Sequence, residues 1–269
     1  MGVLNVTPDS FSDGGRYLEA SAAVAHGLEL VAEGAAIVDV GGESTRPGAQ
    51  PVDAEEELRR VLPVIEALSA AASGAEISID TSKSVVAAAA LEAGATFVND
   101  VSALRFDPQL AGVIAGSGAS CCLMHMLGEP RTMQREPRYD DVVGEVKAFL
   151  EERMSFAVAE GIDERLLLLD PGIGFGKSVA HNLELLRRLD EIVALGRPVV
   201  IGTSRKSFIG ALIAERRGLP EPPPAPQRLP GTLATNVLAL ARGASVFRVH
   251  DVAPTYDALA LAAATLGLR

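Results

Sequence analysis

The chain has 269 residues, 48% of them hydrophobic, which is enough for one large α/β domain with a well-buried core. Its formal net charge is −11 and it contains no Trp and three Tyr, which excludes the basic, aromatic-rich surface that binds nucleic acid. No apolar stretch approaches the roughly 20 residues that span a bilayer, and no signal peptide is recognisable, so we expect a cytoplasmic protein that binds no membrane.

Eight short apolar segments, each ending in a polar or charged residue, alternate with Ala-rich amphipathic segments. The apolar segments predict strands at residues 2–6, 36–40, 76–80, 96–100, 120–125, 166–170, 198–202 and 245–250. The amphipathic segments predict helices at residues 20–32, 54–71, 84–93, 108–115, 142–159, 180–189, 207–216, 231–241 and 254–266. Repeated βα units of this kind predict an α/β protein of the (β/α)8 TIM-barrel class, one domain over residues 1–269.

The polar residues at the strand ends are expected to meet in one pocket, because catalytic groups collect at the C-terminal face of such barrels. They are Asn5, Asp39, Asp80, Asn99, Asp100, His125, Asp170 and His250. Three long connections at residues 7–17, 41–53 and 126–140 follow strands and predict lids and substrate clamps at the same face. A fourth, the proline-rich segment 218–230, lies between helices; a plain linker is the favoured interpretation, and a stiff surface excursion or an oligomer contact is the alternative.

The two cysteines, Cys121 and Cys122, are neighbours on a predicted strand. Alternate side chains of a strand point to opposite sides, so this pair cannot form a useful structural cross-link. We interpret them as two small buried apolar residues in a reducing compartment, not as a redox or metal-binding pair.

The segment DPGIGFGK at residues 170–177 resembles a phosphate-binding loop, but the Walker pattern requires glycine at position 171, where the chain has Pro171. A nucleoside triphosphate site is therefore not expected. Asp170 instead presents a carboxylate, which only accepts hydrogen bonds, and the glycines let the backbone pass close to a flat ligand. Asp80 alone could be a helix N-cap; together, Asp80, Asn99 and Asp170 predict a rim that binds a small planar nitrogen-rich ring.

Positive charge is concentrated in GTSRKS at residues 202–207 and RVHD at residues 248–251. Alternation places Arg248 and His250 on the same side, which predicts an anion site; a salt bridge from Arg248 to a barrel carboxylate is the less favoured alternative. His125, flanked by Met124 and Met126, fits a packed core histidine. Because no His/Cys cluster has the spacing of a transition-metal site, any metal should be a hard cation such as Mg²⁺, held by few protein oxygens and a phosphate.

Eight ordered motifs resemble those of the bacterial dihydropteroate synthases, members of the pterin-binding enzyme family. They are NVTPDSFSDGG (5–15), DVGGESTRPGA (39–49), IDT (79–81), ND (99–100), LMHM (123–126), DPGIGFGK (170–177), GTSRKSF (202–208) and RVHD (248–251). The resemblance implies a transferase of folate biosynthesis. It would condense 6-hydroxymethyl-7,8-dihydropterin diphosphate with 4-aminobenzoate to give 7,8-dihydropteroate and diphosphate, as a homodimer and a target of sulfonamides.

The resemblance also implies a role for individual residues. Pterin would bind to Asp80, Asn99, Met126, Asp170, Phe175, Gly202 and Lys206. 4-Aminobenzoate would bind to Phe11, Thr45, Arg46, Pro47, Lys206 and Ser207. Diphosphate would bind to Asn5, Arg248 and His250, and Mg²⁺ to Asn5 with help from Asp13. The catalytic set would be Asn5, Asp80, Lys206, Arg248 and His250, with no residue acting as an obligatory base.

One departure from the family concerns the start of the chain, because the first predicted strand begins at residue 2 and the segment that usually covers the barrel floor does not precede it. Two alternatives stay open: the native start lies upstream, or this form lacks that segment. Two alternative functions remain open from the residues alone. A corrinoid-linked pterin methyltransferase shares the barrel and the pterin carboxylates but has no diphosphate to bind, so GTSRKSF and RVHD argue against it. A catalytically silent paralogue would bind pterin without joining it to 4-aminobenzoate, and the intact loops at residues 5–15 and 43–48 argue against it.

Overall fold

The structure is a computed structural model that describes residues 1–7, 16–44, 50–72, 74–129 and 132–268. Within these residues, eight strands alternate with helices in chain order. The strands are β1 (Gly2–Asn5), β2 (Ile37–Gly41), β3 (Glu76–Asp80), β4 (Phe97–Asp100), β5 (Ser120–Met124), β6 (Leu167–Asp170), β7 (Val200–Ile201) and β8 (Val246–Phe247). The α-helices are α1 (Arg16–Ala32), α2 (Ala54–Ala71), α3 (Ser84–Glu92), α4 (Leu110–Ser117), α5 (Val142–Ala159), α6 (Val179–Arg187), α7 (Leu189–Val193), α8 (Ser207–Arg217), α9 (Leu229–Ala241) and α10 (Val252–Leu266).

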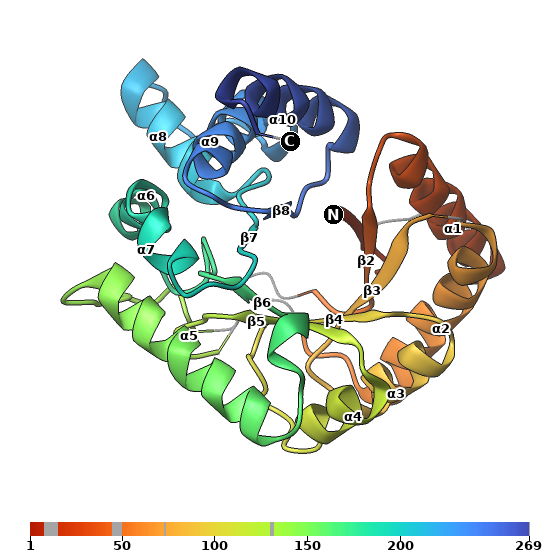
Figure 1. Ribbon diagram of the computed structural model, residues 1–269. Helices are drawn as coiled ribbons and strands as arrows, with labels where there is room; N and C mark the ends of the chain where they lie inside the picture. The colour runs from red at the N-terminus through yellow and green to blue at the C-terminus, as the bar shows by residue number, and fades with distance from the viewer. Residues whose placement is uncertain (8–15, 45–49, 73, 130–131, 269) are drawn as a thin grey trace.

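All the strands are parallel and follow one another around a closed ring. Strands β1 to β6 form one sheet in chain order, and β7 pairs with β8. Bridges from Leu169 to Val199 and from Gly2 to Val249 join the two sheets, and Val3 N donates to Val249 O at 2.9 Å. The helices lie outside this ring (Figure 1). The predicted (β/α)8 barrel is therefore confirmed.

Helix α2 shows why the helices pack on the outside of the ring. Asp53 caps its first turn by accepting a hydrogen bond from Glu56 N at 2.8 Å. Its apolar face, which includes Val61, Ile65 and Leu68, is fully buried in the main core. Burying each such side chain contributes about 1.5–3 kcal/mol, so tertiary packing rather than helix propensity holds α2 in place.

Side chains on the two sides of the strands build two separate cores. Outward side chains pack against the helices, and Cys121 belongs to this core. Cys122 points the other way, into a smaller interior cluster that contains Phe97 and Val200. The two cysteines therefore face opposite sides of β5, as alternation requires.

Two predicted elements differ from the observed ones. The single helix expected at residues 180–189 is two helices, α6 and α7, because the backbone leaves the helical conformation at Arg188 (φ −109°, ψ 30°). The segment 218–230 is more than a linker, because it contains the 3₁₀ turn Ala225–Arg228. Arg228 Nη1 donates to Arg205 O at 3.0 Å, which ties this segment to the loop after β7.

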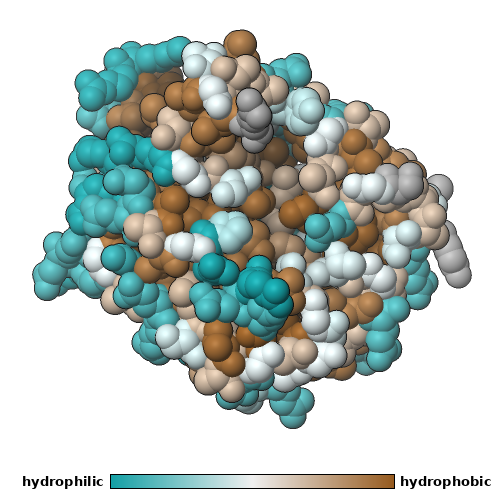
Figure 2. Space-filling model, viewed as in Figure 1, coloured by the Kyte–Doolittle hydropathy of each residue, from teal (hydrophilic) through white to brown (hydrophobic). Residues whose placement is uncertain are grey.

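Surface polarity varies around the barrel. Figure 2, in the view of Figure 1, shows hydrophilic residues gathered over the side occupied by α5 to α8. Among the described residues, no helix combines the length and the apolar composition needed to cross a membrane.

Candidate active site

The strand register sorts the polar strand-end residues into two sets. Asp39 pairs with Ser78, and Asp80 pairs with Asn99, which pairs with the interior residue Cys122. Residues paired across parallel strands point to the same face, so this set faces the barrel interior. Asp170, paired with Met124, lies on the same face.

Asp100 and His125 point the other way, toward the helices. The Asp100 carboxylate accepts hydrogen bonds from Ser102 N at 2.8 Å and from Leu104 N. His125 packs edge-on against Phe149 of α5, with the ring centroids 4.8 Å apart. The prediction that all strand-end polar residues meet in one pocket is wrong for these two. Each lies one position after an inward-facing residue of its strand, so its side chain points to the opposite side. The interpretation of His125 as a packed core histidine is confirmed.

Asp39 is the centre of a buried network inside the barrel mouth. Arg248 Nε donates to Asp39 Oδ2 at 2.6 Å, and Asn99 Nδ2 donates to the same oxygen at 3.0 Å. Ser78 Oγ donates to Asp39 Oδ1 at 2.6 Å. From the sequence, Asp39 is predicted only as a strand-end residue, without a role. Its spacing of two residues from Gly41, at the mouth, was the available signal that it faces inward.

Arg248 forms the salt bridges that were the less favoured interpretation of the sequence. Its Nη2 atom donates to Asp80 Oδ2 at 2.7 Å, in addition to the bond to Asp39. Burial alone would lower the pKa of Arg248, but Asp39 and Asp80 outweigh burial and raise it, so the guanidinium stays charged. Its Nη1 atom has no hydrogen-bond partner among the described residues and remains available to an anion.

Two of the interior carboxylates, Asp80 and Asp170, have raised pKa values. Burial is the main cause that raises the pKa of Asp80 to about 7; Asp39 and Glu57 add to it and Arg248 opposes it. Burial also raises the pKa of Asp170, against the opposing charge of Lys206. Buried carboxylates of this kind gain stabilisation from ligand N–H donors that replace water.

The loop after β6 wraps around the Asp170 carboxylate. Gly172 N donates to Asp170 Oδ1 at 2.6 Å, and Gly172 has a φ of 68°. A Cβ atom at this position would lie 1.8 Å from His125 O, so only glycine fits. Behind the loop, Lys177 Nζ lies 2.9 Å from His125 Nδ1, and burial lowers the pKa of Lys177 to about 7.

Lys206 reaches from the loop after β7 to the loop after β6. Its Nζ atom donates to Ile173 O and lies 4.6 Å from the centroid of the Phe175 ring. Gly202 lies beside it, since a Cβ atom at this position would be in van der Waals contact with Lys206 Nζ at 3.7 Å. Burial lowers the pKa of Lys206 to about 8, although Asp170 opposes this.

An apolar wall stands beside these groups. Met126 clusters with Met124, Val101 and Met133, and Phe175 packs against the cluster. The structure thus brings together, at one mouth, the residues predicted to bind pterin: Asp80, Asn99, Met126, Asp170, Phe175, Gly202 and Lys206.

The loops after β7 and β8 are joined to each other at the same mouth. Ser204 Oγ lies 3.0 Å from His250 Nδ1 and accepts a hydrogen bond from His250 N at 3.2 Å. Arg205, with a φ of 57°, pairs with Asp251 through a bond of 2.9 Å from Nε to Oδ2. These contacts place His250 next to the N-terminus of α8, where Ser207 is exposed and where backbone N–H groups favour anions.

Asn5 ends β1 close to Asp80. A Cβ atom at Gly41 would lie 3.5 Å from Asp80 Cβ and 3.9 Å from Asn5 Oδ1, so the three residues adjoin. The half-buried Asn5 amide has no hydrogen-bond partner among the described residues. A carbonyl oxygen of this kind suits Mg²⁺. The described part of the chain has no group of three His, Cys, Asp or Glu residues that could hold a metal, so most ligands of such an ion would come from elsewhere.

Five predicted site residues lie outside the described residues: Phe11, Asp13, Thr45, Arg46 and Pro47.

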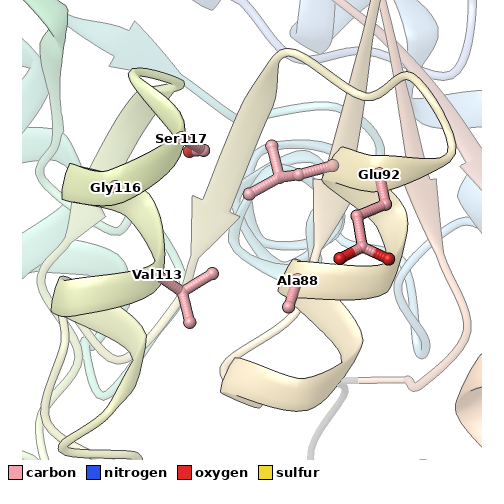
Figure 3. A pocket seen from close by; sticks show the side chains of 6 residues that line it. Ala88, Glu92, Val113, Gly116 and Ser117 are labelled. Carbon is pink, nitrogen blue, oxygen red and sulfur yellow. The ribbon is translucent and has the colours of Figure 1, made fainter.

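A groove elsewhere on the surface lies between α3 and α4 (Figure 3). It is lined by Ala88, Leu91, Glu92, Val113, Gly116 and Ser117. These residues lie toward the C-terminal ends of their helices, which are at the opposite end of the barrel from the C-terminal strand ends. The groove is therefore separate from the mouth that holds Asp170 and Arg248.

Comparison with known proteins agrees with the geometry of this mouth. Residues 1–250 match the model of the family described as pterin binding enzyme. The dihydropteroate synthase of Mycobacterium leprae is 50% identical over 267 residues, which cover 99% of this chain and 93% of that protein. Dihydropteroate synthase from Xanthomonas albilineans, solved with 4-aminobenzoic acid, has a TM-score of 0.91 and 50% identity, covering 100% of this chain and 93% of that one. Its complex with 7,8-dihydropteroate has a TM-score of 0.87 and 47% identity, covering 100% and 94%. The chain belongs to the dihydropteroate synthases of the pterin-binding enzyme family.

Proposed function

We propose that this chain uses the mouth of the barrel to join 6-hydroxymethyl-7,8-dihydropterin diphosphate to 4-aminobenzoate. The observation that carries the proposal is the pair of buried acceptors, Asp80 and Asp170, facing the same mouth as the cations Lys206 and Arg248. A flat ring with N–H donors and a charged tail matches both halves of this arrangement.

The pterin ring would lie between the acidic groups and the apolar wall. Asp170 and Asp80 accept hydrogen bonds from ring N–H groups, and Asn99 can both donate and accept. The Lys206 ammonium group lies over the Phe175 side chain. From there it can donate to an oxygen or nitrogen of a pterin ring that packs against Phe175. Met126 and Phe175 would cover a face of the ring.

The diphosphate would bind at the corner formed by Arg248 and His250. The C–O bond to the pterin methylene breaks and its electron pair leaves with diphosphate, while the ring stabilises the cationic carbon that remains. Arg248 Nη1 can donate to the departing oxygens as their charge develops. Mg²⁺, held by Asn5 with help from Asp13, would neutralise part of the diphosphate charge.

The amine of 4-aminobenzoate then supplies its lone pair to the methylene carbon and loses a proton. An arylamine is unprotonated at neutral pH, so orientation matters more than a strong base, and we assign no residue as an obligatory base. Phe11, Thr45, Arg46, Pro47, Lys206 and Ser207 are proposed to hold 4-aminobenzoate.

The decisive test measures diphosphate release in the presence and absence of 4-aminobenzoate, with dihydropteroate detected in parallel. We expect release that depends on the amine and one dihydropteroate for each diphosphate. Equal release without the amine would mean simple hydrolysis. A silent paralogue would bind the pterin and release nothing.

We also propose that the chain is a cytoplasmic homodimer that requires Mg²⁺. Leu238 on α9 and Tyr256 and Leu261 on α10 are each more than half exposed, and a second copy of the chain would remove them from water. Light scattering should give the mass of two chains, and Leu261→Asp should reduce it to that of one. A single-chain mass for the unmodified protein would contradict the dimer.

A further inference from the structure

Lys177, near the end of the loop after β6, is buried against that loop and is only 3% exposed. Its Nζ atom donates to Phe175 O at 3.0 Å and lies 2.9 Å from His125 Nδ1. A Cβ atom at Gly172 would lie 3.4 Å from this Nζ atom, so the amine also lies against the backbone of the loop. One side chain therefore connects the loop after β6 to the segment after β5.

Both hydrogen-bond partners of Lys177 are neutral. Burial, together with the charges of Lys177 and Arg105, lowers the pKa of His125 to about 2, so its ring is neutral and accepts at Nδ1 when its proton is on Nε2. Burial lowers the pKa of Lys177 to about 7, although Asp170 opposes this. Both the protonated and the neutral amine carry at least two N–H groups, so Lys177 can donate to both acceptors in either state.

His125 is held in place by contacts of its own. Its backbone N donates to Asp170 O at 2.9 Å, which continues the pairing of β5 with β6. Its ring packs edge-on against Phe149, with the centroids 4.8 Å apart. The carbonyl of the next residue, Met126, accepts a hydrogen bond from Arg105 Nη2 at 3.0 Å. His125 is therefore a fixed anchor, one residue before a side chain of the apolar wall.

Phe175, the other end of the bridge, lies in a part of the loop that needs such an anchor. It is flanked by Gly174 and Gly176, whose φ angles are 84° and 65°. Because glycine restricts the backbone least, contacts must fix the orientation of Phe175. Phe175 N donates to Gly172 O at 3.0 Å, and Phe175 O accepts from Lys177. Lys177 thus holds the peptide group that follows the Phe175 ring.

Packing alone does not account for a lysine at this position. Burying an ammonium group costs free energy unless its charge is paired, and neither the His125 ring nor Phe175 O carries a negative charge. An apolar side chain could fill the same space without this cost. What the lysine adds is a pair of N–H donors that reach two different segments of the chain.

We propose that Lys177 is a positioning residue for the pterin ring: by bridging Phe175 O and His125 Nδ1, it fixes Phe175 relative to Met126 and so sets the affinity of the pocket for the ring. Phe175 packs against the cluster that contains Met126, so a shift of the loop would change the shape of the apolar wall. The inference rests on the proposed function, which places the pterin ring against these two side chains.

The main test is Lys177→Met, which keeps an unbranched side chain but removes both N–H donors. Titration calorimetry with 6-hydroxymethylpterin measures the affinity for the ring without diphosphate. We expect the Kd to rise about tenfold, because small displacements of positioning groups cost this much or more. The melting temperature should stay the same or rise, since no charge remains buried at this position. A lysine with a purely structural role would show the reverse: a lower melting temperature and an unchanged Kd.

His125→Leu tests whether the bridge, rather than the charge of Lys177, is responsible. It removes the acceptor and leaves the lysine in place, and the Kd should rise about as much as in Lys177→Met. The double variant should lose no more affinity than either single variant, because both changes break the same connection. An effect of the Lys177 charge on Asp170 would not need His125. The control, Lys147→Met, removes the same charge from a partly exposed lysine of α5 and should leave the Kd unchanged.

The outcomes distinguish failure of the inference from failure of the proposed function. A folded Lys177→Met variant with an unchanged Kd would overturn the inference, and so would losses that add in the double variant. If the double variant does not fold, a rise in both single variants supports the bridge and a rise in Lys177→Met alone rejects it. If one single variant does not fold, the Kd of the other decides: a rise supports the bridge, and an unchanged value rejects it. An unmodified protein that does not bind 6-hydroxymethylpterin would instead reject the proposed function.

Discussion

Arg248 and Asp39 lie 209 positions apart in the chain and meet inside the barrel, where Arg248 Nε donates to Asp39 Oδ2 at 2.6 Å. The contact joins the segment after β8 to β2, across the place where the ring closes. It also means that the arginine expected to receive diphosphate is already held by two carboxylates. Its orientation is therefore set before any anion arrives, which is the condition for electrostatic preorganisation.

Replacing Arg248 by Lys should separate catalysis from ring binding. Lysine keeps the charge but cannot donate to Asp39 and Asp80 in the planar geometry of a guanidinium. We expect kcat to fall roughly 10- to 100-fold. Affinity for 6-hydroxymethylpterin without diphosphate should change by less than about threefold, since Arg248 is not assigned to the ring. Rapid-quench measurement of diphosphate release and titration calorimetry give the two values; equal losses in both would argue against the assignment.

Asp39→Asn should weaken the fold more than the loss of one ordinary hydrogen bond. The change leaves Arg248 with one carboxylate in a buried site, and breaking a buried ion pair costs about 3 kcal/mol of unfolding free energy. Ser78→Ala is the matched control, because it removes one neutral donor to the same carboxylate and should cost about 1 kcal/mol. Urea unfolding measures both, and equal costs would contradict the central role of Asp39.

Asp170→Asn should reduce affinity for the pterin ring. The substitution replaces an acceptor by a donor opposite ring N–H groups and also weakens the bond from Gly172 N. The penalty for an unpaired buried polar group predicts a loss of about 1–3 kcal/mol of binding free energy. Titration calorimetry measures it, with Asp257→Asn on the exposed side of α10 as the control. Identical affinities for the two variants would contradict the pterin site.

Pterin affinity should fall as the pH rises through 8. Burial lowers the pKa of Lys206 to about 8, so its ammonium group donates below this pH and becomes neutral above it. Each further pH unit should cost about tenfold in affinity if the charged form alone binds tightly. Binding measured from pH 7 to pH 10 should show the fall in the unmodified protein but not in Lys206→Met. The same fall in both would assign the titration to another group or to the ligand.

Local patterns were sufficient for most elements of the fold. The bounds of α2, α5 and β3 agree with those predicted, because alternation identifies β3 and capping residues Asp53 and Asp141 mark where the two helices begin. The break at Arg188 between α6 and α7 was not predicted, because no local pattern marks it. Arg188 is distinguished only by its ion pairs, which appear in the folded structure.

The amino-acid sequence by itself determined the barrel, the motifs at its mouth and the family, because side-chain periodicity and motif order are local properties. Only the tertiary structure decided which polar residues face inward, since Asp100 and His125 differ from Asn99 and Met124 by one position in strands whose register is set by their neighbours. The partners of Arg248 were likewise decided only by folding. Ion pairs between residues far apart in the chain depend on the closure of the ring and on helix packing, and neither leaves a local pattern.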